Sequence, residues 1–237
     1  MPHISQLTYA IGDVHGHDEL FERLIDRVRF DAEFARVRPR LVLLGDYIDR
    51  GPQSRQVLDR ILRLEQAGWC DLVALKGNHE DALLRFLDEP EFGDTWLSWG
   101  AGTTLASYGV ELPYSTDKQA WRKVRDTFAA AFDPRHLDLL QRLPAFYQAD
   151  GYMFVHAGVH PDKPLSEQGP ETFMYIRGPF LRAHRACNFV VVHGHTPEAA
   201  VPSDTPWRIG VDTGVYFNGV LTAVRLHGDD RAFFQAR

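Results

Sequence analysis

The sequence contains only two cysteines in 237 residues, and this scarcity limits the class of protein. Cys70 and Cys187 lie far apart, each beside an apolar run, so we predict two buried free thiols and no disulfide framework. Such cysteine usage is typical of a reducing compartment. A basic surface is also lacking, because the formal net charge is -6 and acidic and basic residues are mixed along the whole chain. We therefore expect no nucleic-acid partner.

Long apolar stretches are missing as well. No window is long enough to span a bilayer, and the first residues lack the basic start and apolar run of a secretory signal. These absences favour a cytoplasmic protein without a membrane partner. A hydrophobic content of 44% is nevertheless ordinary for a packed core, and we find no repeat or long linker. We predict a single domain over residues 1–237.

The first third of the chain repeats one pattern, in which an apolar strand is followed by a charged turn and an amphipathic helix. The expected strands cover 7–11, 40–44 and 72–75, and the expected helices cover 18–28, 54–68 and 81–89, with Ser54 as a candidate N-cap. Three such units predict a sheet that is parallel in this part. Its charged turns then meet at the carboxyl edge, where open α/β sheets bind ligands.

The middle of the chain, residues 91–143, has a helical pattern and is predicted to be an insertion. We assign the tryptophans of "WLSWG" in this insertion to packing rather than to a substrate groove. Further strands are expected at 152–158, 188–196, 208–214, 220–226 and 231–236, and they predict a second, mixed or antiparallel sheet packed on the first. The fold class is therefore α/β (α+β), with two packed mixed sheets flanked by helices.

Polar side chains gather at the ends of five apolar strands, where they can converge from distant parts of the sequence. Carboxylate, amide and imidazole donors without thiolates favour Mn, Fe or Zn, and a central aspartate can bridge two such ions. Residues two apart on a strand point to the same side, so either His193 or His195 could reach a metal. The full set is Asp13, His15, Asp46, Asp49, Arg50, Asn78, His79, His156, His193 and His195.

The motifs "GDVHG", "GDYIDRG", "GNHE", "HAG" and "GHTP" occur in this order between Gly12 and Pro197. Together they resemble the signature of calcineurin-like metallophosphoesterases, and the first three resemble the phosphoprotein phosphatase superfamily. The segments "HAGVHPDKPLSEQ", "YIRGPFL" and "RIGVDTG" are similar to short bacterial and phage-type serine/threonine protein phosphatases. The resemblance implies a β-sandwich flanked by helices.

The resemblance also implies residue roles. Asp13, His15 and Asp46 would hold one divalent ion, and Asp46, Asn78, His156 and His195, chosen here over His193, would hold a second. We expect Mn, with Fe or Zn as alternatives. A hydroxide between the two ions would attack phosphorus in line, without a phosphoenzyme. Arg50, Arg177 and Asn78 would bind the substrate phosphate, and Asp49 would orient a protonated His79 that donates to the leaving oxygen.

The expected activity is that of a serine/threonine protein phosphatase acting on a phosphorylated protein or peptide. The rival activity is symmetrical hydrolysis of dinucleoside tetraphosphates, in which diadenosine tetraphosphate gives two ADP. Those rival enzymes commonly lack the acid found here at Asp49. A serine alkoxide needs a proton to leave, whereas a nucleotide phosphate leaves more easily, so the Asp49–His79 pair favours monoester hydrolysis. A non-catalytic metal-binding scaffold is a third alternative, which the intact donor set disfavours.

Overall fold

Three parallel strands, β1 (Ile4–Ile11), β2 (Arg40–Leu43) and β3 (Asp71–Ala74), form one half of the first sheet. The computed structural model describes residues 2–115, 117–185, 187–197 and 200–237. Each of the three strands is followed by a helix, namely α1 (Asp18–Ala35), α2 (Ser54–Gln66) and α3 (Asn78–Asp88). The predicted strand–turn–helix pattern is confirmed. Ser54 is the first helical residue rather than the N-cap, which is Gln53.

The two C-terminal strands complete this first sheet, which is a difference from the sequence expectation. Strand β9 (Leu221–Gly228) pairs antiparallel with β1, and β10 (Asp230–Ala236) pairs antiparallel with β9. The sheet order is β10-β9-β1-β2-β3, so the sheet is mixed. We predicted these strands in the second sheet because pairing between strands some 200 residues apart leaves no local signal in the sequence.

The second sheet is also mixed and has the order β4-β5-β6-β8-β7. Strand β5 (Tyr152–Val155) is parallel to β6 (Val190–His193), which is parallel to β8 (Arg208–Gly210). Strands β4 (Phe146–Ala149) and β7 (Ser203–Asp204) pair antiparallel at the two edges. The predicted architecture of two packed mixed sheets flanked by helices is confirmed.

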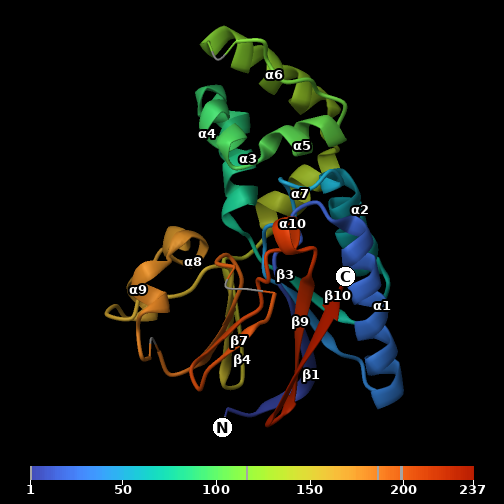
Figure 1. The fold of residues 1–237 in the computed structure, drawn as a ribbon, viewed down its shortest axis with the longest axis vertical. Coiled ribbons are helices and arrows are strands. Elements are labelled where there is room, and N and C mark those ends of the chain that lie inside the picture. The colour runs from blue at the N-terminus through green and yellow to red at the C-terminus, as the bar shows by residue number, and fades with distance from the viewer. Residues whose placement is uncertain (1, 116, 186, 198–199) are drawn as a thin grey trace.

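The insertion between α3 and β4 is helical, as predicted. Figure 1 shows α4, α5 and α6 gathered at one end of the molecule, beyond the two sheets. Short helices α8 and α9 lie on the side of the second sheet away from the first (Figure 1), where they contribute Phe173 and Phe180 to an apolar cluster with Val155 and Val191. None of the described helices has the length and apolar content needed to cross a bilayer. The remaining elements are η1 (Pro90–Phe92), α4 (Gly93–Ser98), α5 (Ala101–Ser107), α6 (Lys118–Ala131), α7 (Pro134–Arg142), η2 (Leu165–Glu167), α8 (Pro170–Tyr175), α9 (Gly178–Leu181) and α10 (Val215–Asn218).

The core has two main layers, one on each face of the first sheet. Between the sheets, Val42 and Val224 of the first sheet pack with Phe154 and Val192 of the second, and all four are fully buried. On the other face, Ile11 and Leu43 pack with apolar side chains of the three flanking helices. Fixing the sheets against each other aligns the ends of β1, β2, β3, β5 and β6, from which the polar side chains project.

The layer between the sheets makes a specific prediction for Phe154. Phe154→Ala should lower the free energy of unfolding by about 3–5 kcal/mol, because it removes a fully buried ring and leaves a cavity between two sheets. Urea unfolding followed by circular dichroism measures this loss. Phe34→Ala is the control, because the Phe34 ring is 85% exposed and its removal should change stability by less than about 0.5 kcal/mol. Similar effects of the two changes would contradict the packing described here.

Candidate metal centre

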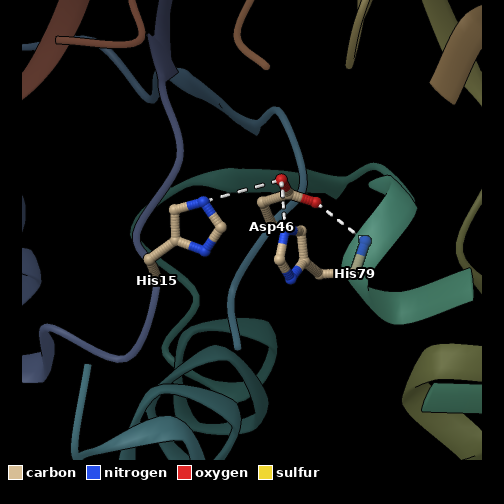
Figure 2. Close-up of side chains that lie close together, drawn as sticks. All are labelled: His15, Asp46 and His79. Carbon is tan, nitrogen blue, oxygen red and sulfur yellow. Dashed lines mark hydrogen bonds and ion pairs between the residues drawn. The ribbon is translucent and has the colours of Figure 1, made fainter. Parts of the chain in front are cut away.

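Asp46 lies at the centre of the polar cluster, in the loop that follows β2, and it is 2% exposed. Figure 2 shows His15 and His79 on either side of its carboxylate. Asp46 Oδ2 is 3.7 Å from His15 Nε2 and 3.8 Å from His79 Nε2. The second oxygen, Oδ1, accepts a hydrogen bond from the His79 backbone N–H at 3.1 Å. One carboxylate thus faces groups from the loop after β1 and from the start of α3.

The other side of Asp46 faces histidines of the second sheet. Asp46 Oδ1 is 3.4 Å from His156 Nε2, which follows β5. That same nitrogen is 3.0 Å from Asn78 Oδ1 and 3.1 Å from His195 Nδ1. Three groups of potential metal ligands occur among the described residues. Two of them share Asp46, namely His15–Asp46–His79 and Asp46–His156–His195, and the third, Asp59–Asp133–His136, does not include it.

Asp13, at the end of β1, links the two sides of this cluster. Its carboxylate oxygens both accept from the His195 backbone N–H at 3.1 Å, and Oδ2 lies 4.0 Å from His15 Nε2. Burial, followed by the charge of Asp212, raises the pKa of Asp13 well above its usual value. A cationic partner would offset the cost of burying this carboxylate.

Backbone carbonyls orient two of the histidines. His15 Nδ1 lies 2.9 Å from the carbonyl of Ile48, and His156 Nδ1 lies 2.9 Å from the carbonyl of Leu44. Burial lowers the pKa of His15 well below its usual value, so in the neutral ring Nδ1–H donates outward and Nε2 keeps a lone pair. Burial also acts to lower the pKa of His156, but the charge of Asp46 outweighs it and raises that pKa to about 9, so the His156 Nε2 carries a proton that a bound cation would replace. Metal-ligating histidines are held in this way, by a hydrogen bond from the ring nitrogen that does not bind the ion.

His195 provides an independent test of whether the cluster fits a metal ion. Its Nε2 is buried and has no hydrogen-bond partner, which is unusual for a buried polar atom. Burial, and then the charge of His156, lower the pKa of His195 to about 2, so its ring is neutral. A neutral imidazole nitrogen without a partner, among carboxylates and an amide oxygen, is suited to a divalent cation.

Asp49 and His79 form a buried pair beside the cluster. His79 Nδ1 is 2.6 Å from Asp49 Oδ2, and both side chains are at most 2% exposed. Burial lowers the pKa of His79, but Asp46 and the hydrogen bond with Asp49 outweigh burial and raise it. The imidazolium form is therefore favoured, with Nε2 free to face the cluster. The Arg50 guanidinium lies next to it, 3.4 Å from His79 Nε2.

The remaining predicted residues differ in their positions. Arg177 is exposed and is the N-cap of α9. Its charge contributes to the lowered pKa of His195, so Arg177 lies near the second-sheet side of the cluster. His195 lies in the cluster, whereas His193 Nδ1 contacts the Gly194 carbonyl at 3.0 Å. The strand ends at His193 and His195 has a φ of 65°, so strand alternation does not relate these two residues.

An aromatic pair borders the cluster and was not identified from the sequence. Helix α10 carries Tyr216 and Phe217, which are 40% and 57% exposed. The Tyr216 ring lies 4.0 Å from the Arg50 guanidinium carbon and 5.5 Å from the His15 ring. The segment "VYFNG" has no periodicity that would have indicated this position, because the helix has only four residues.

Three further residues that support the cluster were also missed. Glu80 accepts backbone hydrogen bonds from the loop that carries Asp46, and Trp96 and Thr104 of the insertion donate hydrogen bonds to Asp49. Glu80 stands three residues after the helix N-cap Gly77, a spacing that indicates a capping interaction and could have revealed it. The prediction that the tryptophans pack is correct for Trp96, which is fully buried.

Comparisons with known proteins agree with this geometry. A family model described as calcineurin-like phosphoesterase matches residues 8–207. A symmetrical bis(5'-nucleosyl)-tetraphosphatase of Delftia acidovorans is 37% identical, over 84% of this chain and 75% of its own length. An asymmetrical bis(5'-nucleosyl)-tetraphosphatase, PrpE, of Anoxybacillus flavithermus is 28% identical, over 91% of this chain and 88% of its own.

A similar fold occurs in the crystal structure of a cold-active protein-tyrosine phosphatase from a psychrophilic Shewanella species. The TM-score is 0.56 at 15% identity, and the match covers 97% of this chain and 80% of that one. The family match covers most of the present chain and includes the loops that carry the buried aspartates and histidines. The chain therefore belongs to the calcineurin-like phosphoesterase family, whose members are metal-dependent hydrolases.

Proposed function

We propose that this protein hydrolyses the phosphoanhydride chain of dinucleoside tetraphosphates. The observation that carries the proposal is the exposed aromatic pair Tyr216–Phe217 beside Arg50. Aromatic faces stack on nucleobases, and a guanidinium binds phosphate oxygens in a bidentate manner, so adjacent groups of these two kinds suit a nucleotide. The relatives named as bis(5'-nucleosyl)-tetraphosphatases, which align with most of the chain, support this substrate class over the expected phosphoprotein.

Two divalent ions would be held by the residues around Asp46. Asp13, His15 and Asp46 would hold one ion, and Asp46, Asn78, His156 and His195 would hold the other. The shared position of Asp46 in both ligand groups supports its role as the bridge. Mixed oxygen and nitrogen donors favour Mn, with Fe or Zn as alternatives. When bound, such ions lower the pKa of water and neutralise charge on the phosphoryl oxygens.

The protein's own side chains would orient the substrate around these ions. Arg50, which contacts both Tyr216 and His79, would bind oxygens of the attacked phosphate, while Asn78 and the exposed Arg177 would contact it from the second-sheet side. His79 would donate the proton on Nε2 to the leaving oxygen, and Asp49 would accept a hydrogen bond from the His79 Nδ1–H. The half-buried position of Arg50 strengthens its attraction for phosphate by limiting screening by water.

Hydrolysis of phosphate monoesters, including those of phosphoproteins, is the second candidate. The observation that favours it is the buried Asp49–His79 pair with its 2.6 Å contact. A serine or threonine alkoxide leaves poorly without a proton, whereas a nucleotide phosphate leaves easily. A retained acid pair is therefore of greater use to a monoesterase, and the same centre can serve both reactions.

The metal assignment predicts the effect of removing the shared ligand. Asp46→Asn should reduce bound Mn from about two ions per chain to fewer than one, because each ion loses an anionic ligand. Elemental analysis after metal loading and desalting measures the stoichiometry. His3→Gln is the control, because His3 is an exposed histidine paired only with Asp229 in the structure described. Full metal content in Asp46→Asn would refute the bridging role.

The substrate assignment predicts a rate difference. Mn-loaded protein should hydrolyse diadenosine tetraphosphate faster than a phosphoserine peptide at equal concentration, because only the nucleotide can use the aromatic pair and its leaving group needs no proton. Chromatography of the nucleotides identifies the bond broken: ADP alone indicates symmetrical cleavage, and AMP with ATP indicates asymmetrical cleavage. Faster release of phosphate from the peptide would reject the nucleotide in favour of the second candidate.

Tyr216 provides the matched variant for this comparison. Tyr216→Ala should raise KM for diadenosine tetraphosphate by about tenfold through loss of base stacking, while KM for the peptide changes less than twofold. Phe30→Ala removes another exposed aromatic ring, 73% exposed on α1, and should change neither value. An equal rise in KM for both substrates would show that Tyr216 acts through Arg50 alone and not on a base.

The acid assignment predicts an effect that depends on the leaving group. Asp49→Asn should retain metal but slow the hydrolysis of serine phosphate about 100-fold, and slow that of 4-nitrophenyl phosphate much less, because nitrophenolate leaves without a proton. Steady-state kcat values for the two esters measure the difference. Equal losses on both esters would remove His79 from the role of general acid.

A further inference from the structure

The helical insertion reaches the candidate centre through α4, α5 and the turn between them. Trp96 Nε1 donates to Asp49 Oδ2 at 2.8 Å, and Thr104 Oγ1 donates to Asp49 Oδ1 at 2.6 Å. Asp49 and Thr104 are fully buried, as is Trp96. The two oxygens of Asp49 are thus held from the insertion while Oδ2 also contacts His79.

The hydrogen bonds around Asp49 form a closed network. The Asp49 backbone N–H donates to Thr104 Oγ1 at 2.9 Å and to Ser54 Oγ at 3.1 Å. Ser54 and Thr104 are hydrogen-bonded to each other at 2.9 Å, and since the Thr104 hydroxyl gives its single proton to Asp49, Ser54 is the donor. Because every member has a partner, rotation of the Asp49 carboxylate would leave at least one buried donor unsatisfied.

The same turn contacts two other predicted catalytic residues. The Gly100 carbonyl accepts a hydrogen bond from the Arg50 backbone N–H at 3.1 Å. Gly100 has a φ of +107°, and a Cβ there would lie 3.0 Å from the Arg50 backbone nitrogen, so a larger residue would push the two apart. The Trp99 ring centroid lies 5.8 Å from that of His79. Residues 96–104 therefore border Asp49, Arg50 and His79 together.

We propose that Trp96 and Thr104 are positioning residues, which hold the Asp49 carboxylate in the orientation that fixes the His79 ring. The insertion then takes part in catalysis by supporting the acid pair, in addition to any effect on substrate access. This role rests on the proposed phosphoester hydrolysis, but it is independent of whether the natural substrate is a nucleotide or a phosphoprotein.

Single and double variants test whether both residues act through Asp49. Trp96→Phe and Thr104→Val each remove one donor and keep most of the side-chain volume. Each should lower kcat for phenyl phosphate about tenfold, with KM changed less than twofold, and should lower kcat for 4-nitrophenyl phosphate less. In an Asp49→Asn background either change should cost less than about twofold, because coupled residues are non-additive.

A spectroscopic measurement tests the same point without turnover. In zinc-loaded protein labelled with ¹⁵N-histidine, the hydrogen-bonded Nδ1 proton of His79 should shift or broaden in Trp96→Phe and in Thr104→Val. Thr104→Ser restores the hydroxyl and should restore both the resonance and kcat. Trp121→Phe is the matched control, since Trp121 is a buried tryptophan of the same insertion whose Nε1 donates to Asp94 at 2.9 Å.

The outcomes separate this inference from the proposed substrate. The positioning role would be overturned by an unshifted His79 resonance together with either of two results. The losses of kcat could add to the loss in Asp49→Asn, or Trp121→Phe could cause the same losses. A shifted resonance with non-additive losses supports it, even where diadenosine tetraphosphate is not hydrolysed. Failure on the dinucleotide alone would overturn only the substrate proposal.

Discussion

One buried carboxylate, that of Glu80, joins two of the loops on which the centre is built, those after β2 and β3. Its Oε2 accepts from the backbone N–H groups of Asp46 and Gly77 at 2.8 and 2.9 Å, and its Oε1 accepts from that of Tyr47 at 2.8 Å. The loop after β2, which carries Asp46, is thereby fixed to the start of α3, where Asn78 and His79 lie. Without this link, three buried N–H groups would lack a partner, at a cost of about 1–3 kcal/mol each.

The link matters because the backbone of the centre is strained. Left-handed φ values cost non-glycine residues about 1–2 kcal/mol each. Within the described ranges, seven non-glycine residues have positive φ, and five of them are predicted site residues: His15, Asp46, Asp49, Arg50 and His195. The loops after β1 and β2 are joined to each other, because the Asp46 carbonyl accepts hydrogen bonds from the N–H groups of Val14 and His15 at 3.0 and 2.9 Å. Hydrogen bonding between loops therefore maintains conformations that point several side chains toward one spot.

The centre depends on hydrogen bonds between distant loops, and this limits how much of the structure can be predicted from the sequence. Strands and helices follow from local apolar periodicity, so the parallel half of the first sheet was accessible. The cluster around Asp46 follows from polar residues at strand ends, whereas the ligand roles within it rest on the resemblance of the motifs. The pairing of β9 with β1 was not accessible, because it joins distant segments. Neither were the bonds from Trp96 and Thr104 to Asp49, which span 47 and 55 residues and involve residue types that equally well fill a core. The assignment of residues 1–237 to one domain stays a prediction.

The proposed chemistry of the centre and the proposed choice of substrate would depend on different parts of this structure. Under the proposed function, the ions held by the buried donors around Asp46 would neutralise charge on any phosphoryl group, and so they would not distinguish an anhydride from an ester. We expect discrimination to come from two features at the border of the cluster: the aromatic pair on α10, which would suit a base, and the proposed acid pair held by the insertion, which would suit a poor leaving group. Both lie against Arg50, so a nucleotide and a phosphopeptide would compete for one phosphate position. On this proposal, a change of substrate within this fold would need alterations in α10 and the insertion, while the strained, buried centre could stay as it is.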